Sequence, residues 1–182
     1  YNTNFDFGTG DFCVMGWVNP SSTTVNASPI FSRGPAGGTT DGKTINFERS
    51  VGSAVLTLRV PGVANVVGTL AMAANAWNHV AVYRVSGTVF FALNGFVENA
   101  GAALSGRDFS SPTAVSRIGV RVEGVPDGVS TNGLALVRVT ATAPSADQIA
   151  HIYRTELPLF QPNAQCTLAG TTSSVTAMAY DE

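Results

Sequence analysis

The stretch that decides the fold is WNHVAVYRVSGTVFFALNG, residues 77–95. Two β-rich runs, HVAVYRV and TVFFALN, flank the pair Ser86 and Gly87. In the first run, Val80 and Val82 fall on one face together with the body of Arg84. Because side chains alternate faces with a period of two, this pattern is typical of strands rather than of a helix. A Ser-Gly pair between two such runs predicts a β-hairpin with one apolar face.

Similar short apolar runs recur along the chain, separated by turn-forming Gly, Pro, Asp and Asn residues. Besides the hairpin strands at 78–85 and 88–93, the strands expected from these runs are 11–18, 29–32, 43–49, 54–60, 64–71, 114–121 and 132–141. Many short strands with regular turns favour an antiparallel sandwich or barrel. A single helix is expected after Ser145, because Gln148 follows at the spacing of a capping box.

The hairpin resembles the WHHVA…YVNG hairpin of laminin-G-like, concanavalin A-like lectin domains. Further landmarks of that family are resembled in the same order by DFCVMGWVNP (11–20), PIFSRG (29–34), SRIGV (116–120) and GLALVRVTATAPSADQIAHIY (133–153). The resemblance implies an all-β fold, an antiparallel jelly-roll β-sandwich with one short C-terminal helix. At 134–136 the chain has Leu-Ala-Leu where relatives often have an acidic residue. No role of that residue is therefore carried over.

Two segments of different character are expected. The sandwich is assigned to residues 1–160, and a linker with the start of a further β segment to residues 161–182. The stretch ELPLFQPNAQ (156–165) has two prolines and is interpreted as an extended linker. The last residues resemble the opening of a β module of the kind that follows laminin-G-like domains in bacteriophage tail proteins. Both abrupt ends predict a segment of a longer polypeptide.

The composition is poor in charge. Charged residues make up 12% of the chain, against about 25% in a typical globular protein. With a net charge of −2 there is no basic surface for nucleic acid. Because no run of about 18 apolar residues occurs, no membrane insertion is expected.

Lys43 is the only lysine, and lysine usually guards edge strands and is depleted in interfaces. We therefore expect a homo-oligomer or packing against other virion proteins, and the resemblance to phage fibres suggests a trimer.

The two cysteines, Cys13 and Cys166, lie far apart in the sequence. A bridge would tie the tail to the first strand, but two cysteines do not make a disulfide framework. Two buried free thiols are the favoured interpretation, and a disulfide is the alternative.

Catalysis is not expected. Glycosidases of the concanavalin A-like fold need two carboxylates side by side on one strand, which places them two residues apart. None of the five glutamates has such a neighbour, and Glu123 and Asp127 are four residues apart across a proline-containing loop. The only histidines, His79 and His151, are not accompanied by a nucleophile motif. The sequence therefore predicts no enzyme and no catalytic residue.

Binding residues are not evident either. Calcium could use oxygens of Asp41, Asp127 and Asn132, but Asp-Gly pairs also simply make turns. No metal or cofactor site is therefore assigned, and weak calcium binding is the alternative.

For sugar binding, Trp17 and Trp77 occupy strand motifs and are expected in the core. Phe109 and Arg33 lie in expected loops and are candidates for contact with a sugar. Nothing converges in the sequence, so no binding site is named.

The function expected is that of a non-catalytic recognition or structural module at the virion surface of a tailed bacteriophage. Such a module would belong to a tail fibre or a surface accessory protein. Its partners would be bacterial surface glycan or other virion proteins. The alternative is a secreted bacterial lectin-like adhesion or carbohydrate-binding domain, with calcium-assisted binding.

Overall fold

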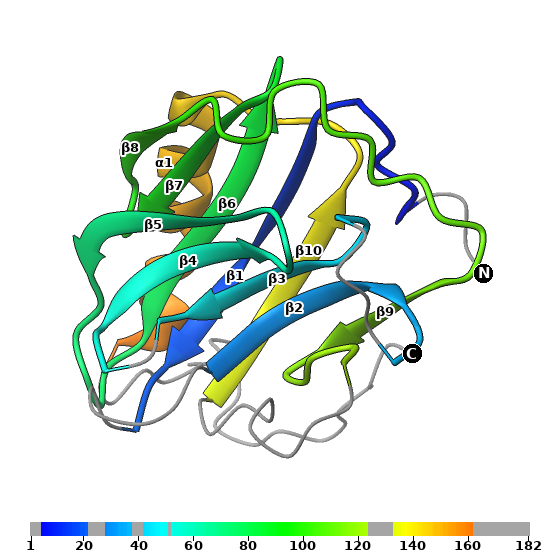
Figure 1. Cartoon of the computed structure of the whole chain (residues 1–182). Helices are drawn as coiled ribbons and strands as arrows, with labels where there is room; N and C mark the ends of the chain where they lie inside the picture. Colours follow the sequence, from blue (N-terminus) through cyan, green and yellow to red (C-terminus); the bar gives the residue numbers. More distant parts are fainter. Residues whose placement is uncertain (1–4, 22–27, 38–41, 51, 124–132, 162–182) are drawn as a thin grey trace, which may run out of the picture.

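A computed structural model describes residues 5–21, 28–37, 42–50, 52–123 and 133–161. Its strands form two five-stranded antiparallel sheets that pack face to face (Figure 1). Sheet A has the order β10 (Gly133–Thr140), β1 (Phe12–Asn19), β6 (Asn78–Val85), β7 (Thr88–Leu93), β8 (Phe96–Gly101). Sheet B has the order β5 (Ala64–Ala71), β4 (Val55–Val60), β3 (Ile45–Arg49), β2 (Ser28–Pro35), β9 (Ala114–Ile118). The antiparallel β-sandwich expected from the sequence is confirmed.

The main core lies between the sheets. Val14 of β1 and Val80 of β6 point inward from sheet A, and Phe47 of β3 and Leu58 of β4 belong to the same buried cluster. The ring of Phe47 stacks at 6.5 Å on that of Phe91 in β7, across the two sheets. Burial of apolar side chains on both inner faces is what holds such a sandwich together.

The hairpin of β6 and β7 forms as predicted. Ser86 and Gly87 have φ values of 48° and 84°, and two positive φ angles are the mark of the type I′ turn that suits twisted strands. The prediction of a single apolar face is wrong, however. His79, Ala81 and Tyr83, on the other face of β6, are buried as well, because a helix covers that side of the sheet.

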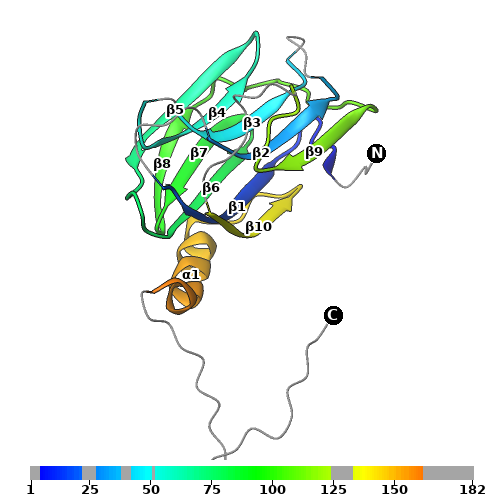
Figure 2. The ribbon, with the colours of Figure 1, turned by 90° about the horizontal axis from the view of Figure 1, so that it is seen from below.

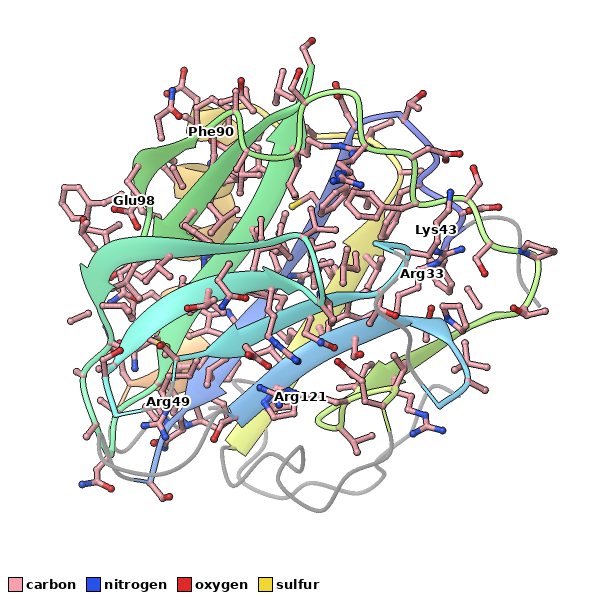
Figure 3. All side chains as sticks on the ribbon, in the orientation of Figure 1. Arg33, Lys43, Arg49, Phe90, Glu98 and Arg121 are labelled. Atoms are coloured by element: carbon pink, nitrogen blue, oxygen red, sulfur yellow. The ribbon has the colours of Figure 1, made fainter. Side chains whose placement is uncertain are left out.

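One strand, β8, is missing from the predicted set. Its sequence, FVENAG, lacks alternating apolar residues, and it forms by pairing with β7 after the turn at Asn94 and Gly95. Glu98 of β8 accepts hydrogen bonds from the backbone N–H and the hydroxyl of Thr69 in β5. Figure 3 shows Glu98 at the edge where β5 and β8 lie side by side. The carboxylate thus joins the two sheets at this edge.

The expected helix is α1 (Ala146–Glu156). Its capping box is complete, since the Gln148 N–H donates to Ser145 Oγ at 3.2 Å and the Ser145 N–H donates to Gln148 Oε1 at 2.8 Å. Figure 2 shows α1 on the outer side of sheet A. In the described part of the chain, no helix is long and apolar enough to cross a membrane.

The interpretation of residues 156–165 as an extended linker is wrong at its start. Leu157–Phe160 form a 3-10 helix, η3, directly after α1. Pro158 lies in the first turn of η3, where its missing N–H breaks no helical hydrogen bond. The predicted further β segment and Cys166 lie outside the described residues, so the domain boundary near residue 160 stays a prediction.

Candidate functional site

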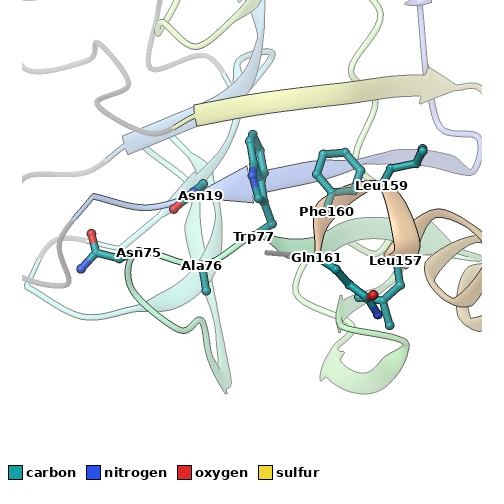
Figure 4. Close-up of a pocket in the computed structure, with 8 residues that line it drawn as sticks. All are labelled: Asn19, Asn75, Ala76, Trp77, Leu157, Leu159, Phe160 and Gln161. Carbon is teal, nitrogen blue, oxygen red and sulfur yellow. The ribbon is translucent and has the colours of Figure 1, made fainter. Parts of the chain in front are cut away.

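A pocket of about 390 Å³ opens at the end of the sandwich, between the end of β1, the start of β6 and η3. Its lining comes from these three segments, which are distant in the sequence (Figure 4). The lining residues are Asn19, Asn75, Ala76, Trp77, Leu157, Leu159, Phe160 and Gln161. None of these described residues carries a charge.

An aromatic platform forms the centre of the pocket. The ring of Trp77 is half-buried and lies 5.0 Å from that of Phe160. Phe160 in turn stacks at 4.1 Å on Trp17, which is fully buried. On the other side, a Cβ at Gly133 would come within 3.2 Å of the Trp77 ring. The expectation of a core position is therefore confirmed for Trp17 and wrong for Trp77, because Trp77 precedes β6 and lies at the rim.

A rigid turn carries the polar side of the pocket. The buried amide of Asn78 donates to the carbonyls of Ala73 and Ala76, both at 2.8 Å, and its oxygen accepts from the Ala73 N–H. The Asn75 N–H donates to the carbonyl of Pro20 at 2.7 Å. These bonds fix the turn on which Asn75 and Ala76 stand. In Figure 4 the Trp77 ring lies between the Asn19 and Asn75 amides on one side and Phe160 on the other.

Glu156 anchors η3, and with it the opposite wall. Its carboxylate accepts from the Trp17 Nε1–H at 2.7 Å and from Arg138 through both Nη1 and Nη2. Burial alone would raise the pKa of Glu156, but the hydrogen bonds from Arg138 and Trp17 outweigh it and hold that pKa below its ordinary value. An ionised carboxylate beneath the rings thus ties the end of α1 to sheet A.

His79 lies under the same rings. Its imidazole is fully buried, and the centre of its ring lies 5.4 Å from that of Trp17. Burial lowers the pKa of His79 to about 4, and the nearby Glu156 and Arg138 charges oppose each other in effect. Neither ring nitrogen has a hydrogen-bond partner among the described residues. His79 is therefore a neutral packing residue, and His151 is exposed on α1.

The outer face of sheet B has a different cover, the segment 119–123, named the strap here. Arg121 of the strap donates to both carboxylate oxygens of Glu48 on β3, each at 2.7 Å. The Val122 N–H donates to Ser32 Oγ on β2 at 3.0 Å. Figure 3 shows Arg121 lying over β2. The Glu48 side chain is only 4% exposed beneath the strap.

The strap also brings Glu123 onto this face. Its Oε1 accepts from Asn46 Nδ2 at 2.8 Å and from Arg59 Nη1 at 3.0 Å. Glu48 and Glu123 thus share one face although 75 residues separate them in the sequence, a proximity that a search for neighbours along one strand could not find. Arg121 occupies both oxygens of Glu48, whereas Arg59 and Asn46 occupy only Oε1 of Glu123, whose buried Oε2 has no hydrogen-bond partner among the described residues.

The loop candidates for sugar contact are wrong. Phe109 is fully buried in the main core, and Arg33 is 2% exposed. Arg33 donates to the Phe109 carbonyl at 2.9 Å and pairs with Asp6 at 3.0 Å. Arg33 thus lies in β2 rather than in a loop, and its guanidinium joins the loop at Phe109 to the N-terminal segment. A core aromatic on a loop between strands cannot be told from an exposed one without the tertiary fold.

Metal ligands are not gathered in the described ranges, where no three His, Cys, Asp or Glu side chains come together. The proposed calcium oxygens of Asp41, Asp127 and Asn132 lie outside the described residues.

Burial raises the pKa of the Cys13 thiol to about 12, so it stays protonated at neutral pH. Whether it pairs with Cys166 stays a prediction.

The arrangement around Trp77 suits one kind of chemistry. An aromatic face offers apolar contact, and the three amides of Asn19, Asn75 and Gln161 can both donate and accept hydrogen bonds. A ligand with an apolar face and several hydroxyl groups matches both features. Without a charged lining residue in the described part, the pocket offers no ionic attraction to such a ligand.

Residues 2–150 match a laminin G-type family model described as the Concanavalin A-like lectin/glucanases superfamily. A search of curated proteins finds no match to this sequence.

Solved structures share the fold. A heptameric SAP-like pentraxin from Limulus polyphemus is 18% identical, with a TM-score of 0.59, over 79% of this chain and 69% of its own. Domain 4 of AbnA, an extracellular arabinanase of Geobacillus stearothermophilus solved with arabinotriose, is 17% identical, with a TM-score of 0.59, over 80% of this chain and 67% of its own. A Trypanosoma rangeli sialidase is 14% identical, with a TM-score of 0.58, over 81% of this chain but only 23% of its own length.

Proposed function

Because this chain belongs to the concanavalin A-like lectin/glucanases superfamily, we propose that it is a non-catalytic carbohydrate-recognition domain. The proposed ligand is an uncharged sugar, bound in the pocket around Trp77. The observation that carries the proposal is the half-buried Trp77 ring beside the amides of Asn19, Asn75 and Gln161. Pockets with a largely apolar lining and a few placed polar groups are the usual form of a ligand site.

The lining also supports the choice of an uncharged sugar. Leu157 and Leu159 stand beside Phe160, and Leu159 is 66% exposed. These leucines suit a methyl or acetamido substituent better than a carboxylate. An acidic sugar would lose hydration in the pocket without gaining an ionic partner among the described lining residues.

The neighbours of known function are consistent with sugar binding but share the fold alone. The arabinanase domain was solved with arabinotriose, and the sialidase is named as an enzyme. We propose binding rather than catalysis for this chain because Arg121 holds both oxygens of Glu48 and Arg59 holds Oε1 of Glu123. The absence of turnover on a panel of polysaccharides is the expected result. Hydrolysis that a Glu123→Gln change abolishes would overturn this part of the proposal.

A glycan array tests the sugar site. Wild-type protein is expected to bind neutral sugars and to prefer those with acetamido or deoxy groups. Trp77→Ala should weaken this binding about tenfold, because it removes the stacking surface. Phe96→Ala is the matched control, since Phe96 is 75% exposed on β8, outside the pocket lining. Equal binding by Trp77→Ala and wild type would refute the site.

Calcium is proposed to be unnecessary for binding. Six to eight oxygen ligands are the usual requirement, and the carboxylates of Asp41 and Asp127 are isolated in the sequence. Array binding should be the same with EDTA and with added calcium. Loss of binding in EDTA would favour the calcium-assisted alternative.

The setting we propose is the surface of a tailed-phage virion, where the domain would contact host glycan as part of an oligomer, with three chains on a fibre axis. The charge-poor composition and the resemblance to phage tail modules support this setting. The alternative is a secreted bacterial adhesion or carbohydrate-binding domain. An antibody against the domain would label purified phage particles in the first case and the medium of uninfected cells in the second. Mass photometry of the full-length protein would give the number of chains.

A further inference from the structure

A second pocket, of about 430 Å³, lies between α1 and the outer face of sheet A. Its walls come from β1, from β10 with the loop that follows it, and from α1. The lining residues are Cys13, Met15, Arg138, Thr140, Thr142, Ala143, Pro144, Gln148 and Ile152. We propose that this pocket binds a small uncharged molecule with an apolar body and one hydrogen-bond-accepting head group. The site is separate from the sugar pocket, and its ligand is of a different class.

The floor of the second pocket suits an apolar body. Cys13 and Met15 project from alternate positions of β1 and are 1% and 4% exposed. Ile152 of α1 and Ala143 pack against the same small cluster. The volume lies within the range of about 300–1,000 Å³ that is usual for ligand pockets. A flexible thioether at the floor can also adapt to the shape of a ligand.

The rim supplies hydrogen-bond donors. Gln148 Oε1 already accepts from the Ser145 N–H, which leaves the Gln148 amide NH₂ to donate. The Thr140 hydroxyl already donates to the Thr142 carbonyl at 2.7 Å, so its hydrogen is not offered to a ligand. The Arg138 side chain is 40% exposed and has five N–H groups. Its Nη1 and Nη2 atoms both donate to Glu156, which leaves further N–H groups for a ligand. The polar part of a ligand should therefore be an acceptor, such as an amide or ester carbonyl.

The charges favour an uncharged head group. Glu156 compensates Arg138 through two hydrogen bonds to the same guanidinium. A ligand carboxylate at Arg138 would compete with Glu156 and be repelled by it. A ligand ammonium would meet the positive guanidinium at the rim. A neutral carbonyl has neither cost and can use the remaining donors.

The test uses octanamide as the probe and the methionine methyl groups as reporters. In protein labelled with ¹³C at the methionine methyl, the Met15 signal should shift saturably as octanamide is added. Met72 is buried in the main core, so its signal should stay in place as an internal control. Octanoate and octylammonium at equal concentrations should bind about tenfold more weakly because their charges are uncompensated.

Two variants locate the site. Gln148→Glu keeps an oxygen for the Ser145 N–H cap but removes the donating NH₂, and should weaken octanamide binding about tenfold. Ala143→Phe should fill the pocket and abolish the Met15 shift. Trp77→Ala, which tests the sugar pocket, should leave the shift unchanged, so failure at either site is seen separately.

Three results would overturn the proposal. One is the lack of a saturable Met15 shift in folded wild-type protein. Another is octanoate binding as tight as octanamide binding. The third is wild-type binding by Gln148→Glu with an unchanged melting temperature, a variant whose cap should let it fold even if Ala143→Phe does not.

Discussion

The outer faces of the two sheets are covered in opposite ways. On sheet B the strap closes the face with charged groups, through Arg121 on Glu48 and Arg59 on Glu123. On sheet A, α1 and η3 close the face with rings, where Trp17 stacks on Phe160 above the neutral imidazole of His79. Both covers bury polar groups, and the two pockets described above lie beside the aromatic cover, one at each end of the α1–η3 segment.

The physical difference lies in directionality. A bidentate arginine–carboxylate pair fixes distance and angle, so the strap lies tightly on the sheet. Rings and aliphatic side chains on a helix pack without such constraints, and a helix can touch a twisted sheet only along part of its length. The faces can therefore be distinguished by perturbation, because the ionic cover depends on pairs of groups and the aromatic cover depends on burial.

The largest effect is expected from breaking the ionic cover. Arg121→Met would leave the Glu48 carboxylate, 4% exposed, without its arginine, and should lower the free energy of unfolding by about 3–5 kcal/mol. Urea unfolding measures the loss. The double variant Glu48→Leu/Arg121→Met should recover most of it. A single-variant loss below about 1 kcal/mol would show that the pair is not buried in solution.

A pH titration probes the burial under the aromatic cover. The pKa of His79 falls from 6.5 to about 4 on folding, so between these pH values the unfolded state binds more protons than the folded state. The contribution of the neutral His79 imidazole to the free energy of unfolding is therefore fully present above pH 6.5. It is lost as the pH falls toward 4, by about 3 kcal/mol in all.

His79→Leu isolates this contribution, because carboxylates titrate in both proteins. Unfolding free energies measured from pH 4 to 7 should fall less steeply in His79→Leu than in wild type. Identical slopes would mean that the imidazole is hydrated in the folded protein.

A smaller effect is expected from the one polar bond within the aromatic cover. Trp17→Phe keeps a ring to stack on Phe160 but loses the Nε1–H that donates to Glu156 at 2.7 Å. The cost should be about 1.5–3 kcal/mol, as is usual for a hydrogen bond to a charged group. A double-mutant cycle with Glu156→Gln measures the coupling. Strictly additive losses would contradict a direct bond.

The smallest effect is expected from an ion pair at the surface. Lys43 and Asp108 lie 3.3 Å apart, with side chains 32% and 47% exposed. Lys43→Ala should leave the melting temperature unchanged within measurement error, in low and in high salt, because water screens exposed pairs. A loss of stability comparable to that of Arg121→Met would show that burial is not the reason why the ion pairs of the strap stabilise the protein.

The sequence predicted the strands well where two signals agreed. Alternation and the Ser86-Gly87 turn located the central hairpin, and the capping box located α1. β8 was missed because Glu98 and Asn99 interrupt any apolar alternation, although the turn at Asn94 and Gly95 preceded it. An edge strand needs fewer apolar residues than a central one, so pairing with β7 and the Glu98 bond to Thr69 suffice.

The candidate site was not predicted because its residues come from three separate segments. Trp77 looked like a core residue from its motif, and Phe109 looked exposed from its loop, yet the structure places them the other way round. Burial depends on which segment packs over a residue, and local pattern carries that information only within a single element.

By itself, the sequence determined the local structure of this protein, because alternation, turn chemistry and capping act over a few residues. It also determined the broad class, an antiparallel sandwich with one helix. Only the tertiary structure decided which side chains meet, as when Trp17 donates to Glu156, 139 residues away. The same holds for Arg121 on Glu48 and for both pockets. Such contacts depend on how the sheets and the helix pack, and no local pattern specifies that geometry.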